Sequence, residues 1–201
     1  MIILDHEQGS EDWFNARLGI ATASMFNCIM TTKQMKRAKS DYIYLLAAEA
    51  ITQRPQEEQF DNVHTRRGNE LESCAIAMYE LDKDVTVNQV GLCKPAIESM
   101  YGFSPDGLIG DNGGLEIKSP QLKKHLQYFN EGVLPSDYAH QVYGSLLVSG
   151  REYWDFMSYS EDYEPFYFRV TRDNEQYQKW AAAFEPVLNE FLTDLKRIIE
   201  L

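Results

Sequence analysis

The sequence predicts an α+β fold in which a central mixed β-sheet is flanked by helices. Two observations lead to this prediction. Helical apolar patterns occupy the first part of the chain and short β-rich segments its middle, after which helices and strands follow one another again. With 201 residues and 44% hydrophobic content, the chain is long enough to bury one sizeable core, so we expect a single domain over residues 1–201.

Two short helices are expected between Ser10 and Met30. Ser10 suits the N-cap of the first helix, because acidic residues follow it in the first turn. Gly19 interrupts the helical pattern, and Thr22 or Ser24 is placed to open the second helix.

Two longer helices are predicted from apolar residues at helical spacing. The first runs from Asp41 to Gln53 and ends before Pro55, which disfavours helical backbone in the residue before it. The second begins near Gly68 and ends near Leu81, and its apolar positions are Leu71, Ala75, Met78 and Tyr79.

The remaining elements form two groups. From Val85 to Lys118, short segments rich in β-forming residues are separated by glycines, so that region is predicted to be a meander of short strands. The second half then continues with helices at Leu122–Glu131 and Tyr138–Ser149, a hairpin of strands at Tyr153–Tyr159 and Pro165–Val170, and a long amphipathic helix at Asn174–Ile199.

Net charge argues against nucleic-acid binding over the whole surface. The chain carries −12 formal charges at neutral pH, whereas nucleic-acid-binding proteins usually present a basic face. A local basic channel is still compatible with this value, because the basic residues are clustered. The clusters are Lys33, Lys36, Arg37 and Lys39; Arg66 and Arg67; and Lys118, Lys123 and Lys124.

Membrane and secretory classes are not favoured. No run of about 18 apolar residues occurs, and the sequence turns acidic directly after Met1-Ile2-Ile3-Leu4, so we expect a cytoplasmic protein. Cys28, Cys74 and Cys93 are an odd number with no CxxC pair, which argues against a disulfide framework and a zinc ribbon. We expect them to be small buried residues.

The densest concentration of chemistry lies between Pro105 and Lys118. Asp106 follows Pro105 in a glycine-flanked turn, and a second turn returns the chain so that Glu116 can face it. Glu116 and Lys118 are two residues apart and therefore share one face of a strand. Singly, these residues suit a solvated turn and an edge ion pair. Together, two carboxylates beside a lysine predict a divalent cation site for phosphodiester cleavage.

Further motifs give this region a family resemblance. Residues 104–108 (Ser-Pro-Asp-Gly-Leu) and 115–118 (Leu-Glu-Ile-Lys) resemble the PD-(D/E)xK nucleases. Three other segments resemble, more specifically, the lambda-phage exonuclease and YqaJ-type viral recombinase family. They are residues 13–24, which contain Trp, Arg, Gly and a final Thr-Ala-Ser in this order, residues 67–72 (Arg-Gly-Asn-Glu-Leu-Glu) and residues 140–143 (His-Gln-Val-Tyr). The resemblance implies a restriction-endonuclease-like core.

The resemblance also implies the roles of the central residues. Asp106 and Glu116 would ligate Mg²⁺, with Mn²⁺ as a substitute, helped by the backbone carbonyl of Ile117. Lys118 would orient or help to deprotonate the attacking water and stabilise the charged phosphate. The amide of Gln141 would hold that water or a ligand oxygen, although a helix-surface glutamine is the simpler interpretation without the family match.

One further carboxylate would come from the helix that begins near Gly68. Glu70 and Glu72 both qualify, but they lie about 200° apart around a helix at ~100° per residue, so both cannot point inward. Glu72 stands at the position that the family uses, and the resemblance gives it a place in the outer metal shell.

The N-terminal motif implies a site for a DNA end. Arg17 and Ser24 would bind a 5′-terminal phosphate, because a guanidinium fork and a hydroxyl are suitable donors to phosphate oxygens. Thr22 belongs to the same motif, and Trp13 could stack near the DNA end. Ordinary alternatives are a surface salt bridge for Arg17, an N-cap for Ser24 and a core position for Trp13.

Taken together, the resemblance implies a Mg²⁺-dependent 5′→3′ exonuclease. It would degrade one strand of linear double-stranded DNA and leave 3′ single-stranded overhangs for recombination by annealing. The family implies a phage or prophage protein of the bacterial cytoplasm, a homo-oligomer in the form of a trimeric ring around DNA, and a single-strand annealing protein as partner.

Two alternatives stay open. The first is another PD-(D/E)xK DNA nuclease, although those with an iron–sulfur cluster need four cysteines and this chain has three. The second is a non-catalytic accessory protein that binds DNA ends. The intact set of Asp106, Glu116 and Lys118 argues against it.

Overall fold

The computed structural model describes residues 1–30, 36–56 and 63–201, with the backbone alone for 36–38 and 63–70. The first half contains β1 (Ile2–Leu4), α1 (Glu11–Ala16), β2 (Ala21–Thr22), the 3₁₀-helix η1 (Ala23–Met25), α2 (Phe26–Ile29), α3 (Lys36–Thr52), α4 (Val63–Lys83), β3 (Val87–Asn88) and β4 (Leu92–Lys94). The second half contains β5 (Tyr101–Gly102), β6 (Gly107–Ile109), β7 (Gly113–Lys118), α5 (Leu122–Glu131), α6 (Ser136–Ser149), β8 (Tyr153–Ser160), β9 (Tyr163–Thr171) and α7 (Glu175–Ile199).

A mixed five-stranded sheet forms the centre of the molecule, in the order β3-β6-β7-β8-β9. The pair β7 and β8 is parallel, while the other neighbours are antiparallel. Helices α5 and α6 form the connection between the parallel pair, because parallel strands need a crossover rather than a tight turn. The predicted α+β fold with a mixed sheet and flanking helices is therefore confirmed.

The predicted meander from Val85 to Lys118 is wrong in its middle part. Strands β3, β6 and β7 do pair antiparallel in the main sheet, but β4 pairs with β1 and β5 pairs with β2 in two separate small sheets. These strands are only two or three residues long, and glycines permit the close approach. A Cβ at Gly91 would lie 2.3 Å from the Leu4 carbonyl oxygen, so only glycine fits there.

The helices differ from the sequence prediction mainly at their ends. Ser10 caps α1 as expected, with its Oγ accepting from the Trp13 N–H at 3.2 Å. The second N-terminal piece is shorter than predicted, since β2 and η1 precede α2. Helix α3 begins earlier than Asp41 and α4 earlier than Gly68, whereas α5 and α7 lie where the periodicity placed them.

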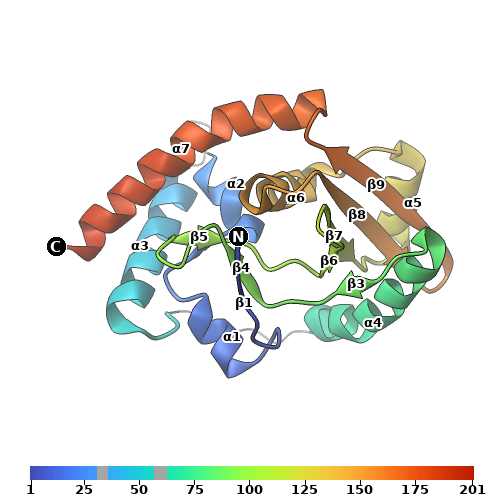
Figure 1. Cartoon of the computed structure of the whole chain (residues 1–201), viewed down its shortest axis with the longest axis horizontal. Helices are drawn as coiled ribbons and strands as arrows, with labels where there is room; N and C mark the ends of the chain where they lie inside the picture. The colour runs from blue at the N-terminus through green and yellow to red at the C-terminus, as the bar shows by residue number, and fades with distance from the viewer. Residues whose placement is uncertain (31–35, 57–62) are drawn as a thin grey trace.

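Alternate residues of the sheet face two apolar layers. Phe156 of β8 packs in one layer with Val142 of α6 and Phe184 of α7, whereas its neighbour Met157 packs in the other layer with Ala75 of α4. Figure 1 shows α3 alongside α7, with α4 next to β3 elsewhere in the molecule. The two covered faces hold the sheet, and the strand ends that carry the chemistry, in place.

Membrane-spanning helices and the burial of the three cysteines are two further points on which the sequence led to an expectation. No helix in residues 1–30, 36–56 and 63–201 combines the length and apolar character that a bilayer crossing needs. The three cysteines are free thiols: Cys93 is buried as expected, Cys28 is half-buried, and Cys74 is exposed, so the prediction of burial is wrong for Cys74. On α4, Cys74 lies beside the buried apolar stripe that contains Leu71 and Ala75 and is not part of it.

A buried polar cluster joins α4 to the sheet. Asp155 of β8 is 3% exposed and accepts two hydrogen bonds from the Arg169 guanidinium, at 2.7 and 2.8 Å. Its Oδ2 also accepts from the Tyr79 hydroxyl of α4 at 2.5 Å. Because each partner satisfies a carboxylate that is withdrawn from water, the cluster fixes the helix against β8 and β9.

Replacing Asp155 by alanine should therefore lower the free energy of unfolding by about 2 kcal/mol. This value lies below that for a fully buried ion pair, because the Arg169 side chain remains 50% exposed. Urea denaturation measures the change. Asp162→Ala, at an exposed position in the β8–β9 turn, is the matched control and should stay within about 0.5 kcal/mol of the parent. Equal stabilities of the two variants would contradict the anchoring role of Asp155.

Candidate active site

Residues that lie far apart in the sequence, between Gln8 and Ser145, meet in one small cavity of about 190 Å³. It lies where the turn before β6, the end of β7, η1, α1 and α6 converge. Of the residues singled out in the sequence, this pocket contains Trp13, Arg17, Ser24, Asp106, Glu116, Lys118 and Gln141, together with Gln8, Ala23, Ser104 and Ser145. We call this cavity the catalytic pocket.

Strand pairing brings the two central carboxylates together. In the antiparallel pair of β6 and β7, Gly107 lies opposite Leu115. The residue before Gly107 is Asp106 and the residue after Leu115 is Glu116, so the same register sets these two side by side. Lys118 lies two residues further along β7 and shares the face of Glu116.

The hydrogen bonds of the pair leave one acceptor unused. Glu116 is 1% exposed, and its Oε1 accepts from the Lys118 Nζ at 2.5 Å. Asp106 Oδ2 accepts from the backbone N–H of Ile117 at 2.5 Å. Among the described residues, Glu116 Oε2 is buried and has no hydrogen-bond partner. A buried carboxylate oxygen without a partner is costly, which points to a cation as its missing partner.

Electrostatics in the catalytic pocket also favour a cation. Burial raises the pKa of both Asp106 and Glu116, which Lys118 only partly opposes, and the charge of Asp106 raises the pKa of Glu116 further. Burial alone would lower the pKa of Lys118, but the neighbouring Glu116 and Asp106 carboxylates hold it above its usual value. Two carboxylates therefore share one ammonium group, and a divalent cation would relieve the remaining repulsion.

Arg17 also lines the catalytic pocket and is surrounded by hydroxyl groups. Its Nη1 donates to Ser104 Oγ at 2.9 Å, and its Nη2 lies 3.5 Å from Thr22 Oγ1. Thr22 Oγ1 and Ser24 Oγ are hydrogen-bonded at 3.1 Å. In the described part of the chain Arg17 forms no ion pair with a carboxylate, and burial lowers its pKa. The salt-bridge interpretation of Arg17 is thus not observed.

The alternatives for Ser24 and Trp13 are not observed either. Ser24 lies inside η1 and is not its N-cap, a position that Thr22 occupies without a capping hydrogen bond from its side chain. Trp13 is half-buried, lies with its ring centroid 4.2 Å from the Arg17 guanidinium carbon, and is not part of the apolar core. Both side chains line the catalytic pocket instead.

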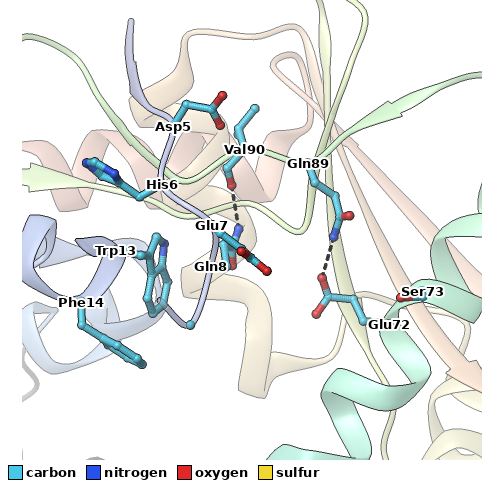
Figure 2. A pocket seen from close by; sticks show the side chains of 11 residues that line it. Asp5, His6, Glu7, Gln8, Trp13, Phe14, Glu72, Ser73, Gln89 and Val90 are labelled. Atoms are coloured by element: carbon cyan, nitrogen blue, oxygen red, sulfur yellow. Dashed lines mark hydrogen bonds between the residues drawn. The ribbon is translucent and has the colours of Figure 1, made fainter. Parts of the chain in front are cut away.

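Glu72 lies in a neighbouring cleft of about 610 Å³, which Figure 2 shows. Gln8 and Trp13 line both this cleft and the catalytic pocket. Glu72 Oε1 accepts from the Gln89 Nε2 at 3.1 Å. Burial and then the charge of Asp106 raise the pKa of Glu72 to about 7, so the three carboxylates influence one another. The side chain of Glu70 lies outside the described residues.

Comparison with known proteins places these observations in a family. Residues 12–152 match the model of the YqaJ-like viral recombinase domain, and all the motifs described above lie inside this range. The chain belongs to the YqaJ-like viral recombinase family. No curated protein sequence matches it.

Solved structures support the same assignment. An alkaline exonuclease from Laribacter hongkongensis is 32% identical, with a TM-score of 0.82 and 95% of each chain covered. The same exonuclease in complex with dAMP gives 30% identity, a TM-score of 0.77 and coverage of 94% of this chain and 96% of that one. A phage-related exonuclease from Haemophilus somnus 129PT, 14% identical with a TM-score of 0.52, shares the fold over 88% of this chain and 96% of its own.

The pocket residues of this YqaJ-like chain fit a hard divalent cation that is bound by few protein ligands. Within the described residues, no group of three or more His, Cys, Asp or Glu side chains converges on one point. Asp106 and Glu116 are the two that would hold the ion, whereas Glu72 lines the neighbouring cleft and does not form a group of three with them. Mg²⁺ is commonly bound by one or two carboxylates, with water and phosphate oxygens completing its shell.

Several pocket residues of the YqaJ-like chain were not singled out in the sequence. Ser104 stands directly before Pro105 in the central motif, and this closeness to Asp106 could have identified it as a pocket residue. Ser145 lies four residues after Gln141 on α6, and that spacing places both on one helix face. Gln8 had no such signal, because its position depends on contacts with Val90 and Pro105 far along the chain.

We predict that Mg²⁺ or Mn²⁺ raises the melting temperature of the DNA-free protein. An ion present at 100 times its dissociation constant adds about 2.7 kcal/mol to the stability of the folded state. Asp106→Asn should remove most of this ion-dependent increase, while Asp111→Asn, at an exposed position in the β6–β7 turn, should retain it. Differential scanning fluorimetry with and without the ion measures both. An undiminished increase in Asp106→Asn would exclude this carboxylate as a ligand.

Proposed function

We propose that this protein is a Mg²⁺-dependent 5′→3′ exonuclease that degrades one strand of linear double-stranded DNA and leaves 3′ single-stranded overhangs for recombination by annealing. The observation that carries the proposal is the shared pocket. A guanidinium surrounded by hydroxyl groups lies in the same small cavity as the two carboxylates and the lysine. The similarity to an alkaline exonuclease, also solved with dAMP, supports DNA as the substrate.

The end-binding part of the proposal rests on Arg17. A half-buried guanidinium that forms no ion pair with a carboxylate of the described residues is a ready site for an anion, and the hydroxyl groups of Ser104, Thr22 and Ser24 add donors. A terminal 5′-phosphate carries two charges and several acceptor oxygens, which suits these donors better than the internal phosphates do. Because Ser104 is two residues from Asp106, a bound end would lie next to the cleavage site.

The cutting part of the proposal rests on Asp106, Glu116 and Lys118. Asp106 and Glu116 would hold the cation, which when bound would acidify a water molecule and polarise the phosphate. Lys118 would release its bond to Glu116 in part and donate to the attacking water or to the charged phosphate oxygens. Gln141, on the α6 face that lines the pocket, would orient the same water with its amide.

Other parts of the proposal concern assembly. The family supports a trimeric ring around DNA and a partner that anneals single strands. A ring fits the net charge of −12, because it would confine basic side chains to an inner channel and leave an acidic exterior. Light scattering of the purified protein measures the oligomeric state directly.

Lys118→Ala should lower the rate of DNA digestion by on the order of 10² to 10³, while DNA binding persists. The reason is that the ammonium group would act on charge that develops during cleavage. Lys179→Ala, at an exposed site on α7, is the matched control and should digest at the parent rate. Digestion of a labelled duplex and fluorescence anisotropy measure the two properties. Full activity of Lys118→Ala would make the assignment of the motif untenable.

Arg17→Ala should slow digestion of a 5′-phosphorylated duplex by about tenfold or more, because charge-assisted hydrogen bonds to the end would be lost. Digestion of the same duplex with a 5′-hydroxyl should be slow in both proteins. Failure of the parent to digest DNA with Mg²⁺ or Mn²⁺ would favour a non-catalytic end-binding protein. If the parent digests the 5′-phosphorylated and the 5′-hydroxyl duplex at equal rates, the result would favour another kind of PD-(D/E)xK nuclease and remove the proposed role of Arg17.

A further inference from the structure

Gln89 Nε2 donates a hydrogen bond to Glu72 Oε1 at 3.1 Å. Among the described residues, this is the one hydrogen bond that the Glu72 carboxylate accepts from another side chain. Figure 2 shows the two side chains facing each other across the cleft, Glu72 from α4 and Gln89 from the segment after β3. We propose that Gln89 is a positioning residue, which holds the Glu72 carboxylate toward the hydration shell of the cation at Asp106 and Glu116. The inference rests on the proposed function and assigns a role to a residue outside the family motifs quoted above.

The backbone on both sides of Gln89 is fixed. Strand β3 pairs with β6 so that Val87 lies opposite Ile109 and Asn88 opposite Leu108. If this register is continued by one residue, Gln89 is opposite Gly107, the neighbour of Asp106. On the other side, the Val90 carbonyl accepts from Gln8 Nε2 at 2.8 Å. The Gln89 amide therefore starts from a backbone position that is itself tied to the strand beside Asp106.

Gln8 strengthens this connection. Its Nε2 also donates to the Pro105 carbonyl at 2.7 Å, so one amide joins the residue after Gln89 to the residue before Asp106. Figure 2 shows Gln8 beside Val90 on the wall of the cleft. Any displacement of the Gln89 segment would thus be transmitted to the turn that carries Asp106.

Glu72 needs a partner of this kind. Helix α4 is anchored further along, where Glu80 Oε1 accepts from the Val87 N–H at 2.8 Å and Tyr79 donates to Asp155. These contacts fix the helix, but the Glu72 side chain has three rotatable bonds of its own. The negative charges of Asp106 and Glu116 would turn an unpartnered Glu72 carboxylate toward solvent.

An amide is better suited to this task than a basic side chain. A lysine or arginine would neutralise Glu72 and compete with the cation for it. The Gln89 amide donates one hydrogen bond to Oε1 and adds no charge, so it orients the Glu72 carboxyl group without neutralising it and leaves Oε2 for water molecules bound to the cation. Outer groups that hydrogen-bond to direct metal ligands affect metal affinity by about tenfold or more, and we expect an effect at the lower end of that range for Gln89, because Glu72 would reach the cation through water.

The test is cation affinity of the DNA-free protein, measured by calorimetric titration with Mn²⁺. Gln89→Met, which keeps the length of the side chain but removes the donor, should weaken binding by about tenfold. Asn88→Met is the matched control, because Asn88 is the exposed last residue of β3, directly before Gln89, and lines a different cavity. It should bind Mn²⁺ like the parent. Gln89→Ala provides a second variant without the donor and should give the same loss.

A double-mutant cycle separates positioning from a general structural effect. In a Glu72→Ala background, Gln89→Met should cause no further loss of Mn²⁺ affinity, since no carboxylate remains to be held. Parent-like affinity of Gln89→Met, or an equal loss in the Glu72→Ala background, would overturn the proposal. Because DNA is absent, the result is independent of digestion: a protein that binds Mn²⁺ but digests no DNA refutes the proposed function alone.

Discussion

Repulsion between Asp106 and Glu116 is the constraint on which the rest of the site depends. The register of β6 and β7 forces the two carboxylates together, and burial makes each of them harder to ionise. Lys118 satisfies one oxygen of Glu116, and the Ile117 N–H satisfies one oxygen of Asp106. The unused Oε2 of Glu116 is then the oxygen at which the proposed cation would bind. A sheet covered on both faces by apolar layers keeps these groups from moving apart.

The sequence allowed the meeting of Asp106, Glu116 and Lys118 to be predicted, because local rules determine it. A short turn reverses the chain between the carboxylates, and two-residue spacing aligns Glu116 with Lys118. The mixed sheet followed from the order of helical and β-rich segments. The family resemblance added Arg17, Ser24, Trp13, Thr22, Glu72, Ile117 and Gln141, whose roles remain predictions.

Long-range partners could not be predicted. Strands β4 and β5 contain two or three residues, too few for their apolar pattern to reveal that their partners are β1 and β2. Gln8 joins the catalytic pocket through two carbonyl oxygens that lie 82 and 97 residues away in the sequence. The exposure of Cys74 depends on which face α4 turns toward the sheet. In each case the missing information is the position of a distant segment.

The bond between Arg17 and Ser104 connects the first motif of the chain to the third. Arg17 would hold the end of the strand, and Ser104 is separated from Asp106 by a single residue, so the protein backbone sets the distance from the bound end to the cut. The donors around Arg17 are the hydroxyl groups of Ser104, Thr22 and Ser24, which would bind phosphate oxygens rather than bases. The size of each released fragment would therefore be constant, whatever bases the strand contains.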